Sequence, residues 1–205
     1  EETEKDWRKP IERDVIDIGD ISLPTHLHLE TALAAVKAGK HVFCEKPFTI
    51  TAAEAEELAE EAEKAGVVHY LNHNYQRCPA VALAKQFIDD GKLGTLFHWR
   101  GAYQQSWLID PTKPLDWKLK KATAGAGPHW DLSSHAVDMA LFLMGKIDRV
   151  HCLTKTFTKE RPLAENPEQT GEVEVDDASL MTVQFGNGAV GTIETTRYAT
   201  GRRNH

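Results

Sequence analysis

The chain has 205 residues, of which 41% are hydrophobic and 27% are charged, and its 31 acidic and 24 basic residues give a formal net charge of −7. These proportions are those of a globular protein long enough for one large domain or two small ones, and they exclude a disordered, collagen-like or disulfide-stapled chain. An acidic chain is repelled by phosphate backbones and no apolar run approaches the ~20 residues that span a bilayer, so we expect neither nucleic acid nor membrane as a partner.

The first third of the chain alternates short apolar runs with helical patterns. Strands are predicted at residues 15–18, 41–44 and 67–71, and helices at residues 28–38 and 51–64. A β-α-β-α-β order implies parallel strands joined by right-handed crossovers. This part of the sequence therefore predicts a parallel α/β sheet.

Local signals fix the ends of these two helices. Gly39 and Gly66 follow the helical patterns where a C-cap glycine is expected. Thr51 and Glu54 have the spacing of a capping box, in which each side chain binds a free amide of the first turn. The second helix should therefore begin at Thr51.

The pattern changes after residue 74, where strands and helices no longer alternate regularly. The expected elements are a helix at residues 80–89, a strand at 96–103, a long loop at 107–121, a helix at 132–144, a strand at 150–157, a Pro- and Glu-rich surface loop at 160–176, and strands at 179–185 and 189–198. The last two strands flank Gly186-Asn187-Gly188, and an Asn-Gly pair that tolerates positive φ is typical of a hairpin.

These patterns predict an α/β chain, with a partial Rossmann parallel sheet followed by an α+β domain that has an open antiparallel sheet. A boundary at residues 74–79 divides the chain into domains at 1–75 and 76–205. The alternating last strands have no following helix to cover both faces of their sheet. We therefore expect the full-length protein to form a homo-oligomer through it.

Cysteine usage bears on the compartment. Cys44, Cys78 and Cys152 stand far apart and form no Cys-x-x-Cys pair. An odd number of cysteines without zinc or disulfide spacing is typical of a reducing compartment. No signal peptide opens the chain, so we expect a cytoplasmic location.

Two loops should lie beyond the carboxyl ends of the parallel strands, where open α/β sheets bind ligands. One spans residues 23–28, and the other is Glu45-Lys46-Pro47, directly after a strand. A lysine ammonium at a buried strand end can stabilise an alkoxide. The alternative is a solvated loop that leads into the next helix.

His26 and His28 raise the question of a metal. Residues two apart at the start of a helix do not share a face, and no third ligand has motif spacing. We therefore expect no metal site, and favour a helix N-terminal cluster near a dinucleotide.

Asp131 and His135 are four residues apart, so on a helix they share a face. A carboxylate beside an imidazole on the side away from the apolar stripe is a recognisable acid–base unit. The alternative is a surface ion pair of little value. Aromatic side chains of the kind that line sugar and nicotinamide pockets crowd the same half of the chain: Tyr75, Trp99, Tyr103, Trp107, Trp117 and Trp130.

Taken together, these segments resemble the glucose-fructose oxidoreductase/inositol dehydrogenase (Gfo/Idh/MocA) family, over nearly the whole chain. The resemblance rests on Asp17-Ile18 leading to Pro24-Thr25-His26-Leu27-His28, on Ala38 through Glu45-Lys46-Pro47, on Asn74-Tyr75-Gln76-Arg77, on Asp131-Leu132-Ser133-Ser134-His135, on Asp176-Asp177-Ala178 and on Asn187-Gly188-Ala189-Val190-Gly191. The Glu-Lys-Pro segment followed by the Asp131/His135 pair is highly specific in this order.

The resemblance implies an NAD- or NADP-dependent oxidoreductase that oxidises a secondary hydroxyl of a sugar, cyclitol or related polyol. By resemblance, the catalytic residues are Lys46, Asp131 and His135; the cofactor-binding residues are Pro24, His26, His28, Glu45, Lys46, Trp117 and Lys118; and the substrate-binding residues are Tyr75, Arg77, Asp131 and His135. Lys46, Asp131 and His135 should then converge in a cleft between the two halves.

Two residues depart from the family pattern. Ser133 stands where relatives usually have glycine, which should tighten the start of that helix. Lys118 stands where many relatives have arginine, which weakens the case for a bidentate contact.

The family's glycine-rich loop, which binds pyrophosphate through backbone amides, is not found in these 205 residues. The acidic residue that reads the ribose 2′-hydroxyl is not found either, so the choice between NAD and NADP stays open. The sequence is therefore interpreted as the central fragment of a longer enzyme, inactive and a poor NAD(H) binder by itself.

Two other functions compete with a dehydrogenase. One is a non-catalytic sensor or co-repressor of the same fold, which need not retain the proton-transfer groups Lys46, Asp131 and His135. The other is a metal-dependent hydrolase or isomerase that uses some of the ten histidines, which metal analysis would detect.

Overall fold

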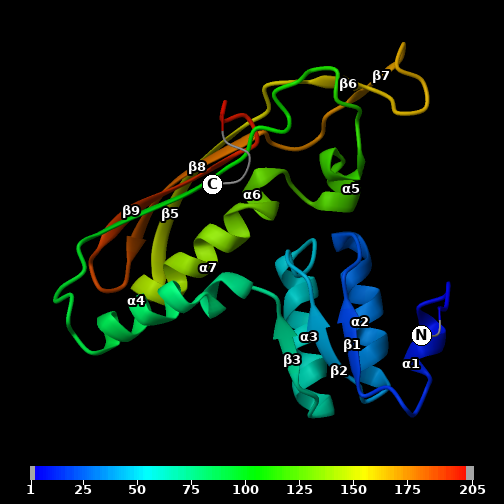
Figure 1. Cartoon of the computed structure of the whole chain (residues 1–205), viewed down its shortest axis with the longest axis horizontal. Coiled ribbons are helices and arrows are strands. Elements are labelled where there is room, and N and C mark those ends of the chain that lie inside the picture. Colours follow the sequence, from blue (N-terminus) through cyan, green and yellow to red (C-terminus); the bar gives the residue numbers. More distant parts are fainter. Residues whose placement is uncertain (1–2, 202–205) are drawn as a thin grey trace. The chain divides into compact units, whose positions relative to one another are not determined.

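The computed structural model describes residues 3–201, which form two compact units (Figure 1). One unit comprises the residues up to Asn72 together with Ala122–Gly125, and the other comprises His73–Lys121 and the chain from Ala126 onward. Within residues 3–201, no helix has the length and apolar character needed to cross a membrane.

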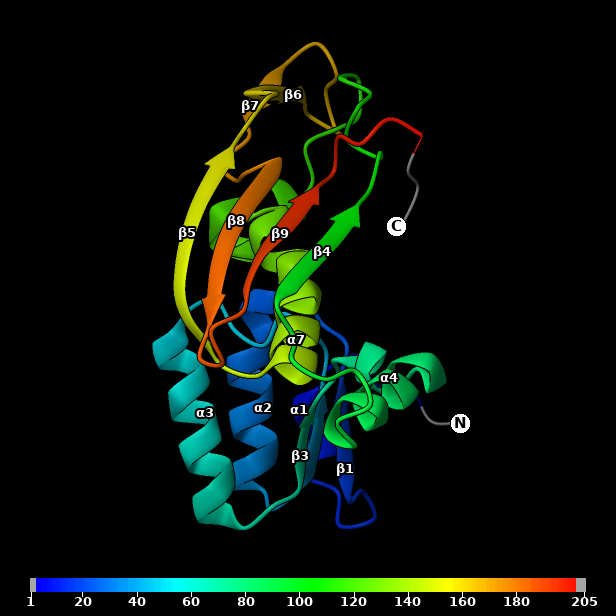
Figure 2. The same cartoon turned by 90° about the vertical axis from the view of Figure 1, so that its left-hand side faces the viewer.

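The first unit is a parallel three-stranded sheet with helices packed on it (Figure 2). Its elements are α1 (Arg8–Ile11), β1 (Ile18–Ile21), the 3₁₀ helix η1 (Thr25–Leu27), α2 (His28–Lys37), β2 (His41–Cys44), α3 (Ala52–Ala65) and β3 (His69–Leu71). The strand order is β1-β2-β3, and both pairs are parallel, as predicted. Small side chains of α2, among them Ala32 and Ala35, pack in a core with Val42 and Cys44 of β2 and Leu58 of α3.

The predicted helix ends are confirmed. Thr51 Oγ1 accepts from the Glu54 amide at 3.2 Å, and the Glu54 carboxylate accepts from the Thr51 amide at 3.0 Å. Gly39 and Gly66 follow α2 and α3 with φ values of 72° and 67°. Only glycine adopts this left-handed conformation without a steric cost.

The first predicted strand is wrong in position. Residues 15–18 were expected to be a buried strand, whereas β1 begins at Ile18 and Val15 is 86% exposed. Val15 lies in a turn, in which the Ile16 amide donates to the Arg13 carbonyl. The apolar run indicated a strand, but only Ile21 in β1 meets the core.

The second unit is built on an open four-stranded sheet. Its strands are β4 (His98–Gln104), β5 (Ile147–Lys155), β8 (Ala178–Phe185) and β9 (Val190–Thr196), in the order β4-β9-β8-β5. The predicted antiparallel arrangement holds for β9–β8 and β8–β5, and β4 adds a parallel pair with β9 at one edge. The sheet is therefore mixed.

The helices α6 (Pro128–Asp131) and α7 (Ser133–Met144) pack on one face of this sheet, and Figure 2 shows α7 there. The unit also contains η2 (Asn74–Arg77), α4 (Pro79–Asp89) and η3 (Trp117–Leu119), and a further short helix, α5, spans Lys121–Ala124. Ala136 and Ala140 of α7 pack in one core with Met181, Phe185 and Ile193 of the sheet. The alternate positions of β8 and β9, such as Leu180 and Val190, are exposed on the opposite face.

The predicted hairpin is confirmed, with a different turn. The loop between β8 and β9 has Gly188 at φ 87°, whereas Asn187 has no positive φ. The Gly188 amide donates to the Phe185 carbonyl at 2.9 Å, and the Phe185 amide donates to the Ala189 carbonyl at 2.9 Å. This is a three-residue hairpin loop that needs left-handed backbone at its last position only.

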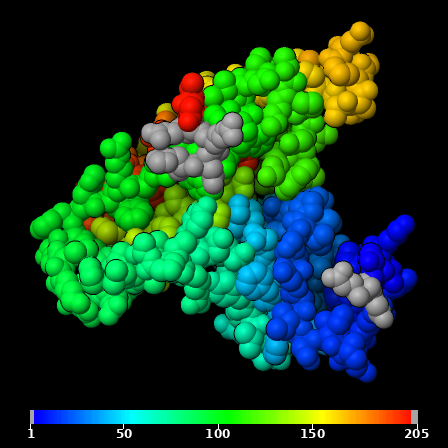
Figure 3. Space-filling view, in the orientation of Figure 1, coloured from blue at the N-terminus to red at the C-terminus, as the bar shows by residue number. Residues whose placement is uncertain are grey.

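The segment 160–176 is more ordered than the surface loop that its Pro- and Glu-rich sequence predicted. It contains the antiparallel pair β6 (Glu160–Pro162) and β7 (Thr170–Glu172), which lies on the surface of the second unit (amber, Figure 3). Val173 and Val175 join a buried cluster, and the Arg161 side chain is fully buried. Arg161 donates to the carbonyls of Leu108 and Asp110 and to the Tyr198 hydroxyl, so it holds the preceding loop in place.

Candidate active site

One buried side chain connects the loops that follow β1 and β2. His28 is 1% exposed, and its Nε2 lies 2.8 Å from the carbonyl oxygen of Leu23, after β1. Its Nδ1 lies 2.9 Å from the Pro47 carbonyl oxygen and 3.1 Å from that of Phe48, after β2. The imidazole therefore holds the two loops together from inside the first unit.

The hydrogen bonds of His28 indicate a structural role for its imidazole. Both ring nitrogens face carbonyl oxygens, and a neutral imidazole donates from one of them only. Neither nitrogen is turned toward a ligand shared with His26, whose side chain is exposed. Among residues 3–201, no three His, Cys, Asp or Glu side chains are grouped as metal ligands.

The Glu45-Lys46-Pro47 loop is also fixed by the carboxylate of Glu45. Its Oε1 accepts from Asn72 Nδ2 at 2.6 Å, and its Oε2 accepts from the Lys46 amide at 3.2 Å. The Glu45 amide donates to the Ile21 carbonyl at the end of β1. Lys46 is half-buried and its peptide bond to Pro47 is cis. The backbone of Lys46 is thus anchored to the ends of all three strands.

Asp131 and His135 lie on two consecutive helices, whereas their spacing predicted that they share one. Asp131 ends α6, His135 lies in the first turn of α7, and Leu132 joins the two helices. His135, which was predicted on the side of its helix away from the apolar stripe, is 8% exposed. Asp131 Oδ2 accepts from Arg197 Nη2 at 2.9 Å, so this carboxylate belongs to a partly buried ion pair.

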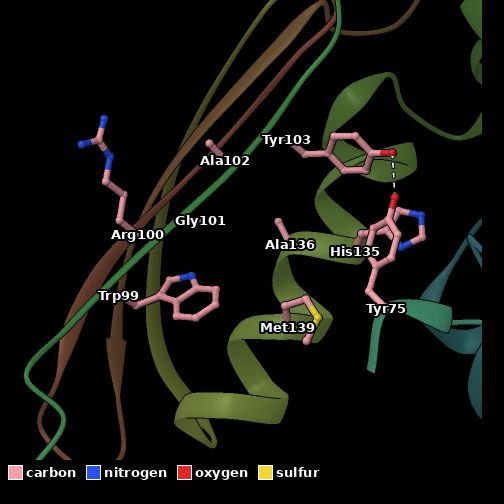
Figure 4. Close-up of a pocket in the computed structure, with 9 residues that line it drawn as sticks. All are labelled: Tyr75, Trp99, Arg100, Gly101, Ala102, Tyr103, His135, Ala136 and Met139. Carbon is pink, nitrogen blue, oxygen red and sulfur yellow. Dashed lines mark hydrogen bonds between the residues drawn. The ribbon is translucent and has the colours of Figure 1, made fainter. Parts of the chain in front are cut away.

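His135 lines an aromatic cavity of about 430 Å³ between α7 and β4 (Figure 4). The imidazole centroid lies 4.6 Å from the ring of Tyr75 and 5.7 Å from the ring of Tyr103. Trp99 and Tyr103 project from β4 toward α7, whereas Arg100 points away from the helix (Figure 4). The cavity has the size and the aromatic lining of a small-molecule site.

The two tyrosine hydroxyls of the cavity share a hydrogen bond. Tyr75 Oη lies 3.0 Å from Tyr103 Oη. Burial, followed by this hydrogen bond and the charge of Tyr103, raises the pKa of Tyr75 to about 12. Tyr75 therefore stays a neutral hydrogen-bonding group at physiological pH.

One helical turn after His135, Asp138 fixes the segment that carries Tyr75. Its Oδ1 accepts from Gln76 Nε2 at 2.7 Å. Burial raises the pKa of Asp138, while the charge of His73 and the bond from Gln76 act in the opposite direction. The η2 turn is thereby attached to α7.

Three further residues predicted by resemblance, Arg77, Trp117 and Lys118, are not among the residues that line the aromatic cavity. Lys118 belongs to η3, where its amide donates to Asp116 Oδ1 at 2.8 Å and its ammonium lies 5.6 Å from the Trp117 ring centroid. Trp117 is 40% exposed, and Arg77 is exposed at the end of η2. Of the predicted substrate residues, Tyr75 and His135 line the cavity, and Arg77 and Asp131 do not.

Two buried contacts of the site were missed from the sequence. Ser133 Oγ and Thr195 Oγ1 lie 2.7 Å apart, and Arg197 binds Asp131. The side chains of Ile193, Thr195 and Arg197 are at alternate positions and are all buried. If the alternating pattern of a strand is extended one residue beyond the end of β9 at Thr196, it predicts that the side chain of Arg197 is buried as well. A buried arginine in such a row signals a buried carboxylate partner.

Comparison with known protein families gives matches to both parts of the chain. Residues 3–73 match the family described as "Oxidoreductase family, NAD-binding Rossmann fold", and residues 81–205 match the GFO/IDH/MocA C-terminal domain. Together these two matches cover most of the sequence.

Individual relatives point to the same family. The chain is 40% identical to levoglucosan dehydrogenase of Pseudarthrobacter phenanthrenivorans, over all of this chain and 55% of that protein. It is 28% identical to myo-inositol 2-dehydrogenase of Thermotoga maritima, over 97% of this chain and 55% of that protein. A solved structure of levoglucosan dehydrogenase with NADH and levoglucosan superposes with a TM-score of 0.94 at 42% identity, over 98% of this chain and 53% of that one. The chain thus spans about half the length of these relatives.

Proposed function

The chain belongs to the Gfo/Idh/MocA family of oxidoreductases, and from this premise we propose that the protein is an NAD(P)-dependent dehydrogenase. It oxidises a secondary hydroxyl of a sugar, cyclitol or related polyol. The observation that carries the proposal is the buried imidazole of His135 in the wall of an aromatic cavity. We assign residues 1–75 to part of the dinucleotide-binding domain and residues 76–205 to part of the substrate domain.

The substrate class follows from the relatives and from the chemistry of the cavity. The levoglucosan dehydrogenase of Pseudarthrobacter phenanthrenivorans makes an anhydrosugar the first candidate, and inositols are the second. Aromatic faces such as those of Trp99 and Tyr103 suit the C–H faces of a sugar ring, and the Tyr75 hydroxyl suits its hydroxyl groups.

We assign three catalytic roles. His135 takes the hydroxyl proton, Lys46 stabilises the developing alkoxide, and Asp131 orients the imidazole or holds a neighbouring hydroxyl. A bound nicotinamide would supply the acceptor for the hydride, and loss of the hydroxyl proton together with that hydride would convert the secondary alcohol to a ketone.

We assign the cofactor to the loops of the first unit that hold Pro24, His26 and Glu45. The Glu45–Asn72 bond and the His28 ring give these loops a fixed shape, so His28 serves the cofactor by supporting the loops. We assign Trp117 and Lys118 to contacts with the nicotinamide of the cofactor, and Arg77 to contacts with the substrate. NAD is the first candidate cofactor, since relatives of known structure carry NADH.

A hydride-transfer assay tests the proposal. The full-length protein is mixed with NAD⁺ or NADP⁺ and with levoglucosan, myo-inositol or scyllo-inositol, and absorbance at the reduced-nicotinamide band is followed. Turnover of at least one polyol is expected, and His135→Ala should lower kcat by about 10²- to 10⁴-fold. The matched control is His69→Ala, which changes an exposed histidine of β3.

The result also separates a dehydrogenase from its main competitor. A protein that binds NAD(H) and a sugar in calorimetry but reduces no cofactor would be a sensor or co-repressor, and the proposal would fail. A protein whose His135→Ala variant keeps its turnover would still be a dehydrogenase, but with another base.

We propose that the full-length protein self-associates through the open face of the β4-β9-β8-β5 sheet. Leu153 and Leu180 are directly opposite one another on that face and are 61% and 47% exposed. Arg149 and Glu194 supply charges of both signs on the same face. Leu180→Glu should therefore lower the mass measured by light scattering, whereas Val68→Glu, at an exposed site of the first unit, should not.

A cytoplasmic location completes the proposal. Cys44, Cys78 and Cys152 are free thiols, and Cys44 is buried. Free thiols persist in a reducing compartment. A fluorescent fusion of the full-length protein, followed by cell fractionation, tests the location.

A further inference from the structure

We propose that Arg197 is a positioning residue that orients the carboxylate of Asp131 for the reaction. The inference rests on the proposed dehydrogenase function and extends it to a residue outside the family motifs. It concerns residues of the second unit only.

The two side chains form an ion pair at the boundary between core and solvent. Arg197 Nη2 donates to Asp131 Oδ2 at 2.9 Å. The Arg197 side chain is 1% exposed, whereas that of Asp131 is 22% exposed. The cation is therefore enclosed by the protein, and the carboxylate keeps an accessible side.

The guanidinium is held in place by its neighbours. Its carbon lies 5.0 Å from the ring centroid of Trp107, within the range of a cation–π contact. Trp107 Nε1 donates in turn to Gln105 Oε1 at 2.8 Å. Arg197 directly follows β9, and its backbone amide donates to the Asp177 carbonyl. The ring of Trp107 covers one face of the planar guanidinium, and the backbone of Arg197 is held by its hydrogen bond. The guanidinium therefore presents its N–H to Asp131 in one orientation.

Stability alone explains this arrangement poorly. Nε and Nη1 of Arg197 are buried and have no hydrogen-bond partner among residues 3–201. A buried arginine with polar atoms left unsatisfied costs free energy that a well-packed apolar residue would not. Its charge is offset by Asp131 and by the nearby buried carboxyl of Asp177. We therefore assign the benefit of Arg197 to the orientation of Asp131.

Asp131 is the residue through which Arg197 acts. It ends α6, four positions before His135, and the hydrogen bond from Arg197 Nη2 to its Oδ2 restricts the orientation of its carboxylate. Misplacement of a catalytic group by about 1 Å can cost on the order of 100-fold in rate. Loss of Arg197 should therefore lower kcat and leave the KM for NAD⁺ unchanged.

A double-mutant cycle in the full-length enzyme tests the assignment. Arg197→Ala is expected to lower kcat by about 10- to 100-fold. In the Asp131→Asn background it should cause no further loss, because residues that act as a unit are not additive. Free guanidinium ion should restore part of the activity of Arg197→Ala, since the substitution leaves a site of that shape.

Two further variants control for a general effect of removing a buried arginine and for loss of folding. Arg161→Ala removes another fully buried arginine, which contacts carbonyls and a tyrosine hydroxyl, and its effect should add to that of Asp131→Asn. If Arg197→Ala does not fold by circular dichroism, Arg197→Lys replaces it, and its kcat should lie between wild type and Asp131→Asn. Losses that add in the cycle, or a wild-type kcat in Arg197→Ala or Arg197→Lys, overturn the positioning role. A wild-type enzyme that turns over no polyol overturns the proposed function itself.

Discussion

The hydroxyl of Ser133 lies 2.7 Å from the hydroxyl of Thr195, and both side chains are buried. Thr195 Oγ1 also lies 3.3 Å from the Pro128 carbonyl oxygen at the start of α6. The first turn of α7, which carries His135, is thereby fastened to β9. The family resemblance implies glycine at the position of Ser133, and glycine has no hydroxyl that could make this connection.

Removing either hydroxyl should destabilise the fold. Ser133→Ala is expected to lower the free energy of unfolding by about 1 kcal/mol, and Thr195→Val by about 1–3 kcal/mol because it leaves a second buried oxygen unsatisfied. Urea unfolding of both variants and of the double variant measures the coupling. Equal and additive losses would show that the two hydroxyls do not interact.

The sequence was sufficient for features that depend on near neighbours. The capping box of Thr51 and Glu54 lies within one helical turn, and the strand at residues 41–44 is continuous in the chain. The Asp131–Arg197 pair was not predictable in the same way, because its members are 66 residues apart. Helical spacing placed His135 on the side of its helix away from the apolar stripe. It did not identify the rings of Tyr75 and Tyr103 that lie beside the imidazole, because local periodicity carries no information about distant segments.

His28 should matter to cofactor binding without touching a ligand. His28→Ala removes the contacts that join the loops after β1 and β2, so both loops gain freedom that NAD⁺ must then freeze. We expect the Kd for NAD⁺ in the full-length protein to rise about tenfold, which corresponds to about 1.4 kcal/mol. His69→Ala, at an exposed position of β3 outside these loops, is the control, and isothermal calorimetry measures both variants. An unchanged Kd in His28→Ala would exclude the supporting role.

The Cys44 thiol should be inert in the folded protein. Burial, together with the charges of Glu45 and Asp20, raises the pKa of Cys44 to about 12. Because the thiolate is the nucleophile, alkylation near pH 8 should leave Cys44 unmodified, while the exposed Cys78 reacts. Mass spectrometry of iodoacetamide-treated protein, with and without denaturant, reports each site. Fast native labelling of Cys44 would contradict this description of its surroundings.

The buried carboxyl of Asp177 should make stability depend on pH. Burial raises its pKa, although amides of Phe157 and Thr158 donate to it at 2.7 and 3.1 Å. An acid with a raised folded-state pKa stabilises the fold fully below its unfolded-state pKa, and this stabilisation is lost as the pH rises through the folded-state value. Relative to Asp177→Asn, the wild type should therefore lose free energy of unfolding as the pH is raised from about 3 to neutrality. Parallel pH profiles of the two proteins would rule out the shift.

Tyr75 tests whether the aromatic cavity works as proposed. Its pKa of about 12 keeps the hydroxyl neutral, so it donates or accepts a hydrogen bond but takes no proton from the substrate near pH 7. Tyr75→Phe removes a neutral hydrogen bond worth about 0.5–1.5 kcal/mol, which corresponds to a two- to tenfold loss in kcat/KM.

The pH profile separates this effect from loss of the base. With the His135 ring retained, the pH profile of kcat/KM in Tyr75→Phe should keep the midpoint of the wild type, because the acid–base group is unchanged. Tyr70→Phe, in β3 of the first unit, serves as the matched control, and its kinetics should equal those of the wild type. A midpoint that moves, or a loss in Tyr75→Phe as large as that in His135→Ala, would assign the proton transfer to Tyr75.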